Sequence, residues 1–364
     1  MTFFNKSALA LALLTAVGVA SAANVSIYGR IDTGIAYQNH FGDSTKSDSL
    51  TMETGTNTAS RVGIQGSEQI NDDLSVGFRM ESRFASDTGE LKGDRLFEGS
   101  AFLKLFSKQM GELAAGRIAG MGSGSGPYDL QIFMDSFGGG TFGTALAPVK
   151  STRMDNVLVY RTPMMAGFQA TFQHSLKKET TDKGDESEGA VDRFWAAGFR
   201  FNVGQLNLVG VYEGVTWGHL NANAPDNDRK VFTLGGSYRF EPVTVYAQAQ
   251  YFDGVEKLDG FASSGSNAMT GLKGYGIYLG TQTWHGLSSW QSMIYYRDYE
   301  SSERATGCDF DADSIGVATK YLYRPTKTVE MYVGGGVSKW DRLSEGKVLT
   351  DKSFNVFTGV TKYF

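Results

Sequence analysis

The sequence has a single cysteine, few prolines and no long apolar segment beyond its first 22 residues. Because Cys308 has no partner in the chain, an intramolecular disulfide cannot form. Charged residues, glycine or asparagine interrupt every later apolar stretch well before the roughly 20 residues that a membrane helix requires. A disulfide-stapled scaffold and a helical membrane protein are therefore excluded.

The chain also lacks the short motifs of common catalytic sites. Its four histidines form no H-E-x-x-H sequence, and there is neither a G-x-S-x-G turn nor a spaced Cys/His set. The Gly-Ser run at 122–126 lacks the Lys-Ser/Thr ending of a phosphate loop. The sequence predicts no catalytic residue, no cofactor and no metal site, and the protein is not expected to be an enzyme.

Residues 1–22 have the layout of a cleaved signal peptide. Lys6 supplies the positive charge, an apolar stretch too short to span a bilayer follows, and Ala20 and Ala22 fit the small-x-small cleavage rule. The mature chain, 23–364, then keeps a mildly acidic net charge, which disfavours a nucleic-acid binder.

Alternation of apolar and polar residues with period two dominates the mature chain. Val25, Ile27 and Ile31 share one face of the first segment, while Arg30 and Asp32 lie on the other. About 16 such segments follow one another, an even number as single-chain outer-membrane barrels have. The candidate strands are 24–37, 60–70, 74–86, 96–106, 111–118, 153–162, 166–175, 191–203, 204–217, 230–240, 242–253, 271–283, 286–300, 313–324, 328–340 and 352–364.

The joins between these segments alternate in length. A soluble sandwich has no reason to sort its loops in this way, whereas membrane barrels have short periplasmic turns and long external loops. The pattern predicts an all-β fold, a transmembrane antiparallel β-barrel with both termini on the periplasmic side and a lumen wide enough for water. The long joins are 38–59, 87–95, 119–150, 176–190, 218–229, 254–270, 301–312 and 341–351.

Several motifs resemble those of the Gram-negative general porins, of the beta-proteobacterial type. They are Ser26–Asp32, Ser60–Glu68, Gly116–Arg117, Asn156–Pro163 and the terminal Tyr363–Phe364. The resemblance implies an outer-membrane diffusion channel for small hydrophilic solutes and ions, assembled as a homotrimer among outer-membrane lipid and lipopolysaccharide. It also implies that Phe364 is part of an assembly signal.

The long insert at 119–150 stands where such porins carry the constriction loop that folds into the barrel. Its Phe137, Gly138 and Gly139 resemble the tip motif of that loop, although Ser136 replaces the acidic residue usually found before the phenylalanine. The resemblance implies that this insert narrows the pore.

The same resemblance implies a charged constriction. Opposed charges across a pore would order water and ions, and four arginines against two acids predict mild anion preference. Arg79, Glu81 and Arg83 share one strand face and are expected to form an ion-pair ladder instead. The predicted constriction residues are the basic Arg30, Arg61, Arg117 and Arg161 and the acidic Asp129 and Asp135.

Three alternatives stay open at this point. A substrate-specific channel would need aromatic residues at regular inward spacing, and a structural anchor would have only an incidental pore. Asp309, Asp311 and Asp313 alternate as in a calcium loop, but the sixth-position glycine and the twelfth-position glutamate are absent. That run is therefore either a solvated acidic loop or a loose external divalent-cation site.

Overall fold

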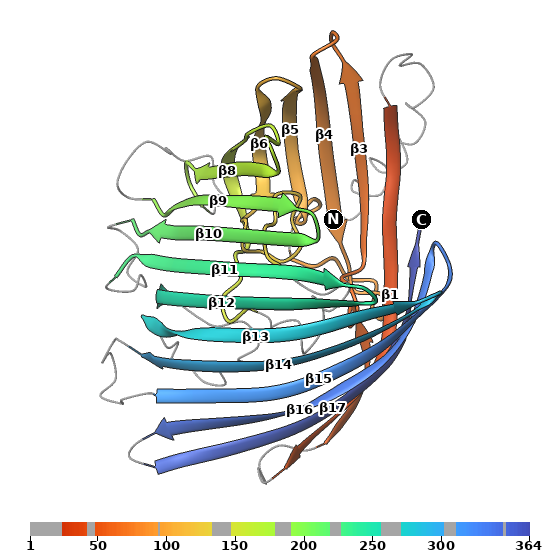
Figure 1. Cartoon of the computed structure of the whole chain (residues 1–364), viewed down its shortest axis with the longest axis vertical. Helices are drawn as coiled ribbons and strands as arrows, with labels where there is room; N and C mark the ends of the chain where they lie inside the picture. Colours follow the sequence, from red (N-terminus) through yellow and green to blue (C-terminus); the bar gives the residue numbers. More distant parts are fainter. Residues whose placement is uncertain are drawn as a thin grey trace, which may run out of the picture.

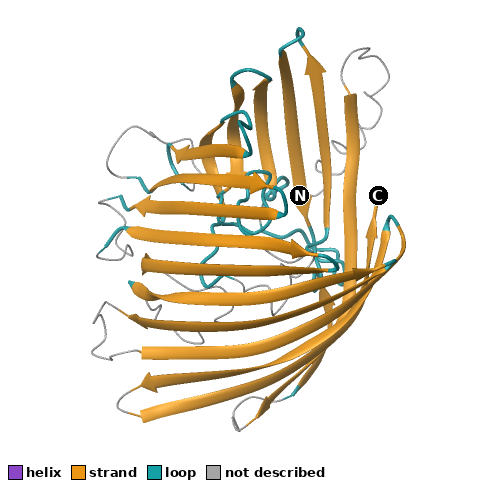
Figure 2. Cartoon of the chain, viewed as in Figure 1, coloured by secondary structure: helices purple, strands orange, loops and turns teal. Residues whose placement is uncertain are grey.

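The protein is an all-β barrel whose strands follow one another around a single wall (Figures 1 and 2). In the ranges that the structure describes, no helix is long and apolar enough to cross a membrane. The computed structural model describes residues 24–41, 48–93, 95–132, 147–178, 191–218, 227–255, 271–301, 311–344 and 347–364, so the expected signal peptide at 1–22 lies outside the described residues.

The strands lengthen from one side of the wall to the other, from eight residues in β5 to seventeen in β17. Their bounds are β1 (Asn24–Phe41), β2 (Ser49–Thr54), β3 (Arg61–Gln69), β4 (Leu74–Arg83), β5 (Ser100–Ser107), β6 (Gly111–Ala119), β7 (Arg153–Arg161), β8 (Phe168–Ser175), β9 (Arg193–Val203), β10 (Leu206–Thr216), β11 (Arg229–Phe240), β12 (Val243–Val255), β13 (Leu272–His285), β14 (Ser288–Ser301), β15 (Asp311–Thr326), β16 (Val329–Ser344) and β17 (Lys347–Tyr363).

The wall closes because β1 is paired on both sides. Its partner on one side is β17, antiparallel from Arg30↔Tyr363 to Phe41↔Lys352. On the other side β3 pairs with the first part of β1 and β2 with the second, so these two short strands together fill one place in the ring. The predicted sixteen-stranded antiparallel barrel is confirmed, and closure leaves no open edge.

Two predicted joins contain more strand than expected. The join 38–59 includes β2, and the join 341–351 is mostly a hairpin in which β16 and β17 stay paired up to Ser344↔Lys347. Alternation of apolar and polar residues identifies only the part of a strand that faces hydrocarbon. Where the hairpins continue beyond that band, polar and charged residues outnumber the few apolar ones, such as Leu50 and Met52, and the repeats are too few to identify a strand.

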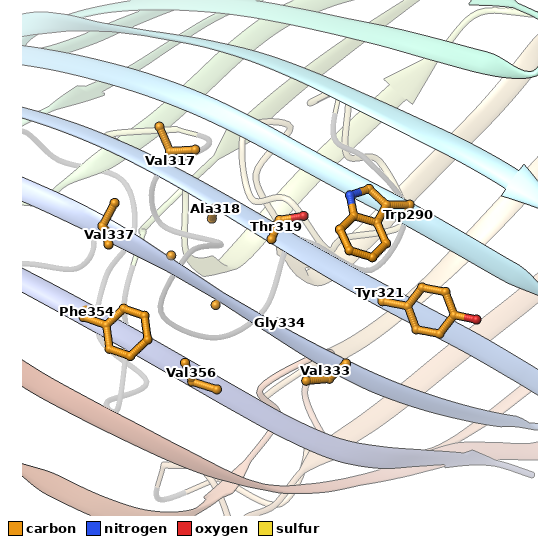
Figure 3. Close-up of a pocket in the computed structure, with 12 residues that line it drawn as sticks. Trp290, Val317, Ala318, Thr319, Tyr321, Val333, Gly334, Val337, Phe354 and Val356 are labelled. Atoms are coloured by element: carbon orange, nitrogen blue, oxygen red, sulfur yellow. The ribbon is translucent and has the colours of Figure 1, made fainter.

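The outer face is apolar, as the alternation predicts. Ile27, Ile31 and Ile35 of β1 are 43–49% exposed, whereas Asp32 on the opposite face is fully buried. On β14–β17 the apolar surface forms a shallow groove over Gly334, Gly335 and Gly336 (Figure 3). The groove is lined among others by Trp290, Val317, Tyr321, Val333, Val337, Phe354 and Val356.

Gly29 is placed at the seam where the chain closes. The Gly29 N–H donates to the Phe364 carbonyl, and the Gly29 carbonyl accepts from the Phe364 N–H, both at 3.0 Å. A Cβ on Gly29 would meet the Phe364 ring and lie 2.5 Å from the Arg61 carbonyl oxygen. The terminal phenylalanine, predicted to act in assembly, thus packs where a side chain on β1 is missing.

Gly29→Val is therefore expected to impair closure. Overpacking at backbone contacts costs on the order of 1–3 kcal/mol, so at the urea concentration that half-unfolds the unchanged protein the folded fraction should fall by about threefold or more. Heat-modifiable mobility in electrophoresis measures that fraction. Gly204→Asn is the control, because Gly204 has open space around its Cβ position and Asn tolerates its positive φ of 56°. Equal folding of the two variants would contradict the prediction.

Candidate functional site

The segment that follows β6 leaves the sheet and lies on the inner wall. Met121 N donates to Gln173 Oε1 of β8 at 3.0 Å, and Gly122 N donates to Glu213 Oε1 of β10 at 3.0 Å. Ser151, where the chain returns, donates to both oxygens of Glu213 at 2.6 and 2.8 Å. One buried carboxylate therefore ties both ends of the inserted segment to the wall.

Further hydrogen bonds hold the segment along the inner wall of the barrel. Ile132 N donates to Gln248 Oε1 of β12 at 3.2 Å, and its carbonyl accepts the hydroxyl of Tyr278 on β13. Val149 exchanges two hydrogen bonds with the Gln250 amide, at 2.7 and 3.0 Å. Residues 120–132 and 147–152 thus run along the inside of β8–β13.

Glycines on the inner wall make room for this close approach. A Cβ on Gly198 of β9 would lie 2.7 Å from Leu130 Cδ1, and one on Gly276 of β13 would overlap the Pro148 ring. Met121, Tyr128, Leu130 and Ile132 join the buried apolar cluster of the neighbouring wall. Inward glutamines and glycines on consecutive strands were a signal for the path of the loop that sequence reasoning did not use.

Three arginines stand in one row across neighbouring strands on the other side of the ring. Arg30 of β1 is opposite Arg61 of β3, and Arg61 is opposite Arg83 of β4. The expected ion pairs form around Glu81, whose carboxylate lies 3.1 Å from Arg61 Nη1, 2.7 Å from Arg79 Nη2 and 3.7 Å from Arg83 Nε. Like charges directly opposite one another destabilise a sheet. The row of arginines therefore lowers the stability of the barrel, and the needs of folding do not explain it.

Arg117, predicted to belong with Arg30 and Arg61, has a different setting. It lies in an irregularity between β6 and β7 and is opposite Ala101, in the register row that continues to Met80 on the outer side. Arg117 Nη1 pairs with Asp155 Oδ1 at 2.7 Å, and Arg95 Nη1 binds the same carboxylate at 2.7 Å. Arg117 is therefore not a member of the row of three arginines, although its Nε donates at 3.0 Å to the carbonyl of Glu98, whose carboxylate lies 4.0 Å from Arg83 Nε.

Arg161 instead holds the inserted segment. Its Nη2 donates to the Pro127 carbonyl at 3.2 Å, and its guanidinium carbon lies 4.5 Å from the centre of the Tyr128 ring. Arg200, which the sequence analysis did not single out, donates from Nη2 to the Asp129 carbonyl at 3.2 Å. These two arginines fix the backbone of the loop from the wall beneath it.

The predicted acidic side of the constriction is described only in part. Asp129 turns back on its own loop and accepts the Gly124 N–H at 2.7 Å. Burial, with a smaller contribution from the nearby Glu213, raises the pKa of Asp129 to about 7. Asp135 and the tip residues Phe137, Gly138 and Gly139 lie outside the described residues.

The raised pKa of Asp129 predicts that selectivity changes with pH near neutrality. Below pH 7 this carboxyl becomes neutral, so the anion preference should rise as the pH falls from 8 to 6 and decline as Asp129 ionises at higher pH. Reversal potentials in planar bilayers at both pH values measure the change. Asp129→Asn should abolish most of it, and an undiminished pH shift in that variant would assign the titration to other groups.

The described part of the acidic run lies at the start of β15. Asp311 and Asp313 belong to β15, where Asp313 is opposite Asp298 and Asp341, and Asp309 lies outside the described residues. Within the described ranges, no group of three or more His, Cys, Asp or Glu residues is arranged to hold a metal ion. Asp311 and Asp313 therefore alternate with the period of a strand.

Comparison with known proteins gives the family. A family model described as Gram-negative porin matches residues 8–342. The chain belongs to this family. An outer membrane porin of Bordetella pertussis is 28% identical over 92% of this chain and 94% of its own, and outer membrane porin protein 32 of Delftia acidovorans is 29% identical over 65% and 66%. The porin is therefore a protein of the bacterial outer membrane.

Solved structures agree on the fold. The anion-selective porin from Comamonas acidovorans superposes with a TM-score of 0.67 at 19% identity, covering 94% of this porin and all of that chain. Salmonella typhi OmpF gives a TM-score of 0.60 at 16% identity, with 93% and 97% covered. At these identities the match shows the barrel and carries no conclusion about selectivity.

Proposed function

We propose that this porin is a general diffusion channel with mild anion preference, in which small hydrophilic solutes and ions pass through a water-filled lumen. The observation that carries the proposal is the arginine row of β1, β3 and β4. Arg61, Arg79 and Arg83 outnumber the carboxylates of Glu81 and Glu98 that they contact, and Arg30 adds a fourth positive charge opposite Arg61. Because guanidinium groups stay charged at physiological pH, the surplus is a fixed positive field beside the path of the solute.

The inserted loop supplies the opposite side of the passage. It is held by Glu213, Gln248 and Gln250 on the inner wall and by Arg161 and Arg200 from beneath. A loop anchored at this many points is expected to keep the bore narrow and constant. Solutes would then be sorted by size at the loop and by charge at the arginine row.

The family and the fold point to a channel rather than an enzyme, and within channels the rival is a substrate-specific pore. Such a pore would need inward aromatic rings that a sugar can touch. Tyr278, Tyr295, Tyr332 and Phe357 do face inward, but they are only 2–8% exposed. Rings buried to this degree offer no sliding surface, which favours general diffusion.

Liposome swelling tests the proposal directly. Uncharged sugars of rising size should enter at rates that fall smoothly with size, and reversal potentials should show a modest preference for chloride over potassium. A single saturable solute would favour the substrate-specific channel. If none of the solutes tested enters the liposomes, only a structural role remains.

We further propose that the porin assembles as a homotrimer through the part of its wall that has the shortest strands, β5–β8. A relative, the OmpT protein of Vibrio cholerae, has been solved in a trimer form. Strands β5 and β8 have eight residues each, and at about 3.3 Å per residue and a tilt near 45° they rise only about 19 Å, less than an apolar band of about 25 Å. Exposed Leu103 and Leu113 on this wall would be covered by a neighbouring copy.

Leu103→Ala should therefore lower the temperature at which trimers dissociate, by roughly 2–5 °C in semi-native electrophoresis, since a leucine buried at an interface contributes on the order of 1–2 kcal/mol. Leu279→Ala on the tall β13 is the matched control, because Leu279 is similarly exposed, 55% against 62%. Equal shifts in the two variants would move the interface elsewhere.

A further inference from the structure

A short segment between β2 and β3 leaves the sheet and enters the lumen. The pairing of β2 with β1 ends at Thr33↔Thr54 and that of β3 ends at Arg30↔Arg61. Residues 55–60 therefore stand opposite only Ile31 and Asp32, four residues more than the ladder can use. The surplus bends inward and is distinct from the inserted loop that follows β6.

The Asn57 side chain binds this segment to the last three strands, β15, β16 and β17. Its Oδ1 accepts from Lys320 Nζ of β15 at 2.8 Å, and its Nδ2 donates to Glu330 Oε2 of β16 at 3.0 Å and to Thr361 Oγ1 of β17 at 3.2 Å. Its backbone N–H donates to Asp32 Oδ1 at 3.4 Å. Asn57 is 1% exposed, so all of these bonds replace water.

Two residues further on, the same segment touches the arginine row. The Ala59 carbonyl accepts from Arg30 Nε at 3.2 Å and from Arg61 Nε at 3.3 Å. These arginines are direct cross-strand neighbours that repel each other, and a carbonyl oxygen shared between them offsets part of that repulsion. The orientation of the two guanidinium groups therefore depends on the position of the Ala59 carbonyl.

From these contacts we infer that Asn57 is a positioning residue for ion selectivity: it anchors the 55–60 segment so that the Ala59 carbonyl fixes the orientation of Arg30 and Arg61. The inference deepens the proposed function and rests on it. Glutamine is too long for the site, and aspartate would offer no donor to Glu330 or Thr361. An asparagine is thus the side chain that satisfies one cationic donor and two acceptors in this space.

The test uses Asn57→Ala in the full-length porin, with Asn355→Ala as control, because Asn355 is another buried asparagine and belongs to β17, opposite Gln38 of β1 and Gly336 of β16. Labelling of arginines with phenylglyoxal, read by mass spectrometry, reports their accessibility without reference to transport. Arg30 and Arg61 should be labelled several-fold faster in Asn57→Ala, whereas the exposed Arg239 serves as an unchanged internal reference.

Reversal potentials complete the experiment. Asn57→Ala should lower the anion-to-cation permeability ratio about twofold, and it should have no further effect when Arg30 and Arg61 are already serine. Unchanged labelling and unchanged selectivity, with only the thermal stability reduced, would overturn the inference and leave Asn57 a seam residue. Faster labelling without any selectivity change, in this variant and in Arg61→Ser alike, would retain the positioning and refute the proposed selectivity. If Asn57→Ala does not fold, Asn57→Ser, which keeps an acceptor for Lys320, is measured in the same way.

Discussion

Arg61→Ser is expected to reduce the anion preference of the channel about two- to fourfold. A unit charge about 5 Å from a passing ion in water-like surroundings contributes on the order of 0.8 kcal/mol, and salt screens part of it. Arg61 is the middle member of the row and pairs with Glu81, so its removal also leaves Glu81 less compensated. Reversal potentials under a salt gradient measure the ratio.

Two further variants make this result specific. Glu81→Gln keeps the shape of the side chain but removes the negative charge among Arg61, Arg79 and Arg83, so it should shift the ratio in the opposite direction. Arg239→Ser removes the same kind of charge from an exposed site beside Glu241 and should change little. Equal shifts from Arg61→Ser and Arg239→Ser would mean that net charge, and not this row, sets selectivity.

The second large effect is expected from Glu213→Ala. The carboxylate accepts hydrogen bonds from Gly122 N and from the Ser151 hydroxyl, one at each end of the inserted loop. Its removal leaves those donors buried and unpaired, at a cost of about 2–4 kcal/mol. The loop should then leave the wall for part of the time, and single-channel records should show strong current fluctuations and altered mean conductance.

Glu213→Gln is the control for this prediction. The amide oxygen of glutamine still accepts from one of the two groups at the base of the loop, so the fluctuations should be much weaker than in Glu213→Ala. Quiet single-channel records in the alanine variant would show that Gln248, Gln250 and Arg161 hold the loop without help from Glu213.

The barrel was readable from the sequence because one physical rule applies to every strand. Lipid on one side and water on the other impose period-two alternation, and Ile27 and Ile31 against Arg30 and Asp32 obey it. β2 was hidden because it lies in a polar join, although Leu50 and Met52 alternate there as well, at 73% and 60% exposure. Short strands beside a polar loop give too few repeats to be distinguished from it.

The sequence predicted residues of the site only where the alternation within a single strand was sufficient to place them. Alternation placed Arg30 and Arg61 inside, but it could not show that Arg83 stands level with them, because register between strands is not written in either strand alone. Arg117 was assigned to the same group on its motif. The irregularity beside Gly116 has its extra residue on β7, where Asn156 has a φ of 54°, and the row of Arg117 leads through Ala101 to Met80, which only a structure reveals.

The segment anchored by Asn57 also sets an order of events in folding. Its hydrogen bonds to Glu330 and Thr361 join residues 273 and 304 positions apart in the chain. Contacts of such separation form late, because the intervening chain must first be ordered. The 55–60 segment can bind only after the last three strands have been added. A barrel trapped before closure would therefore have Arg30, Arg61 and Arg83 in one row but not the anchored Ala59 carbonyl that orients two of them.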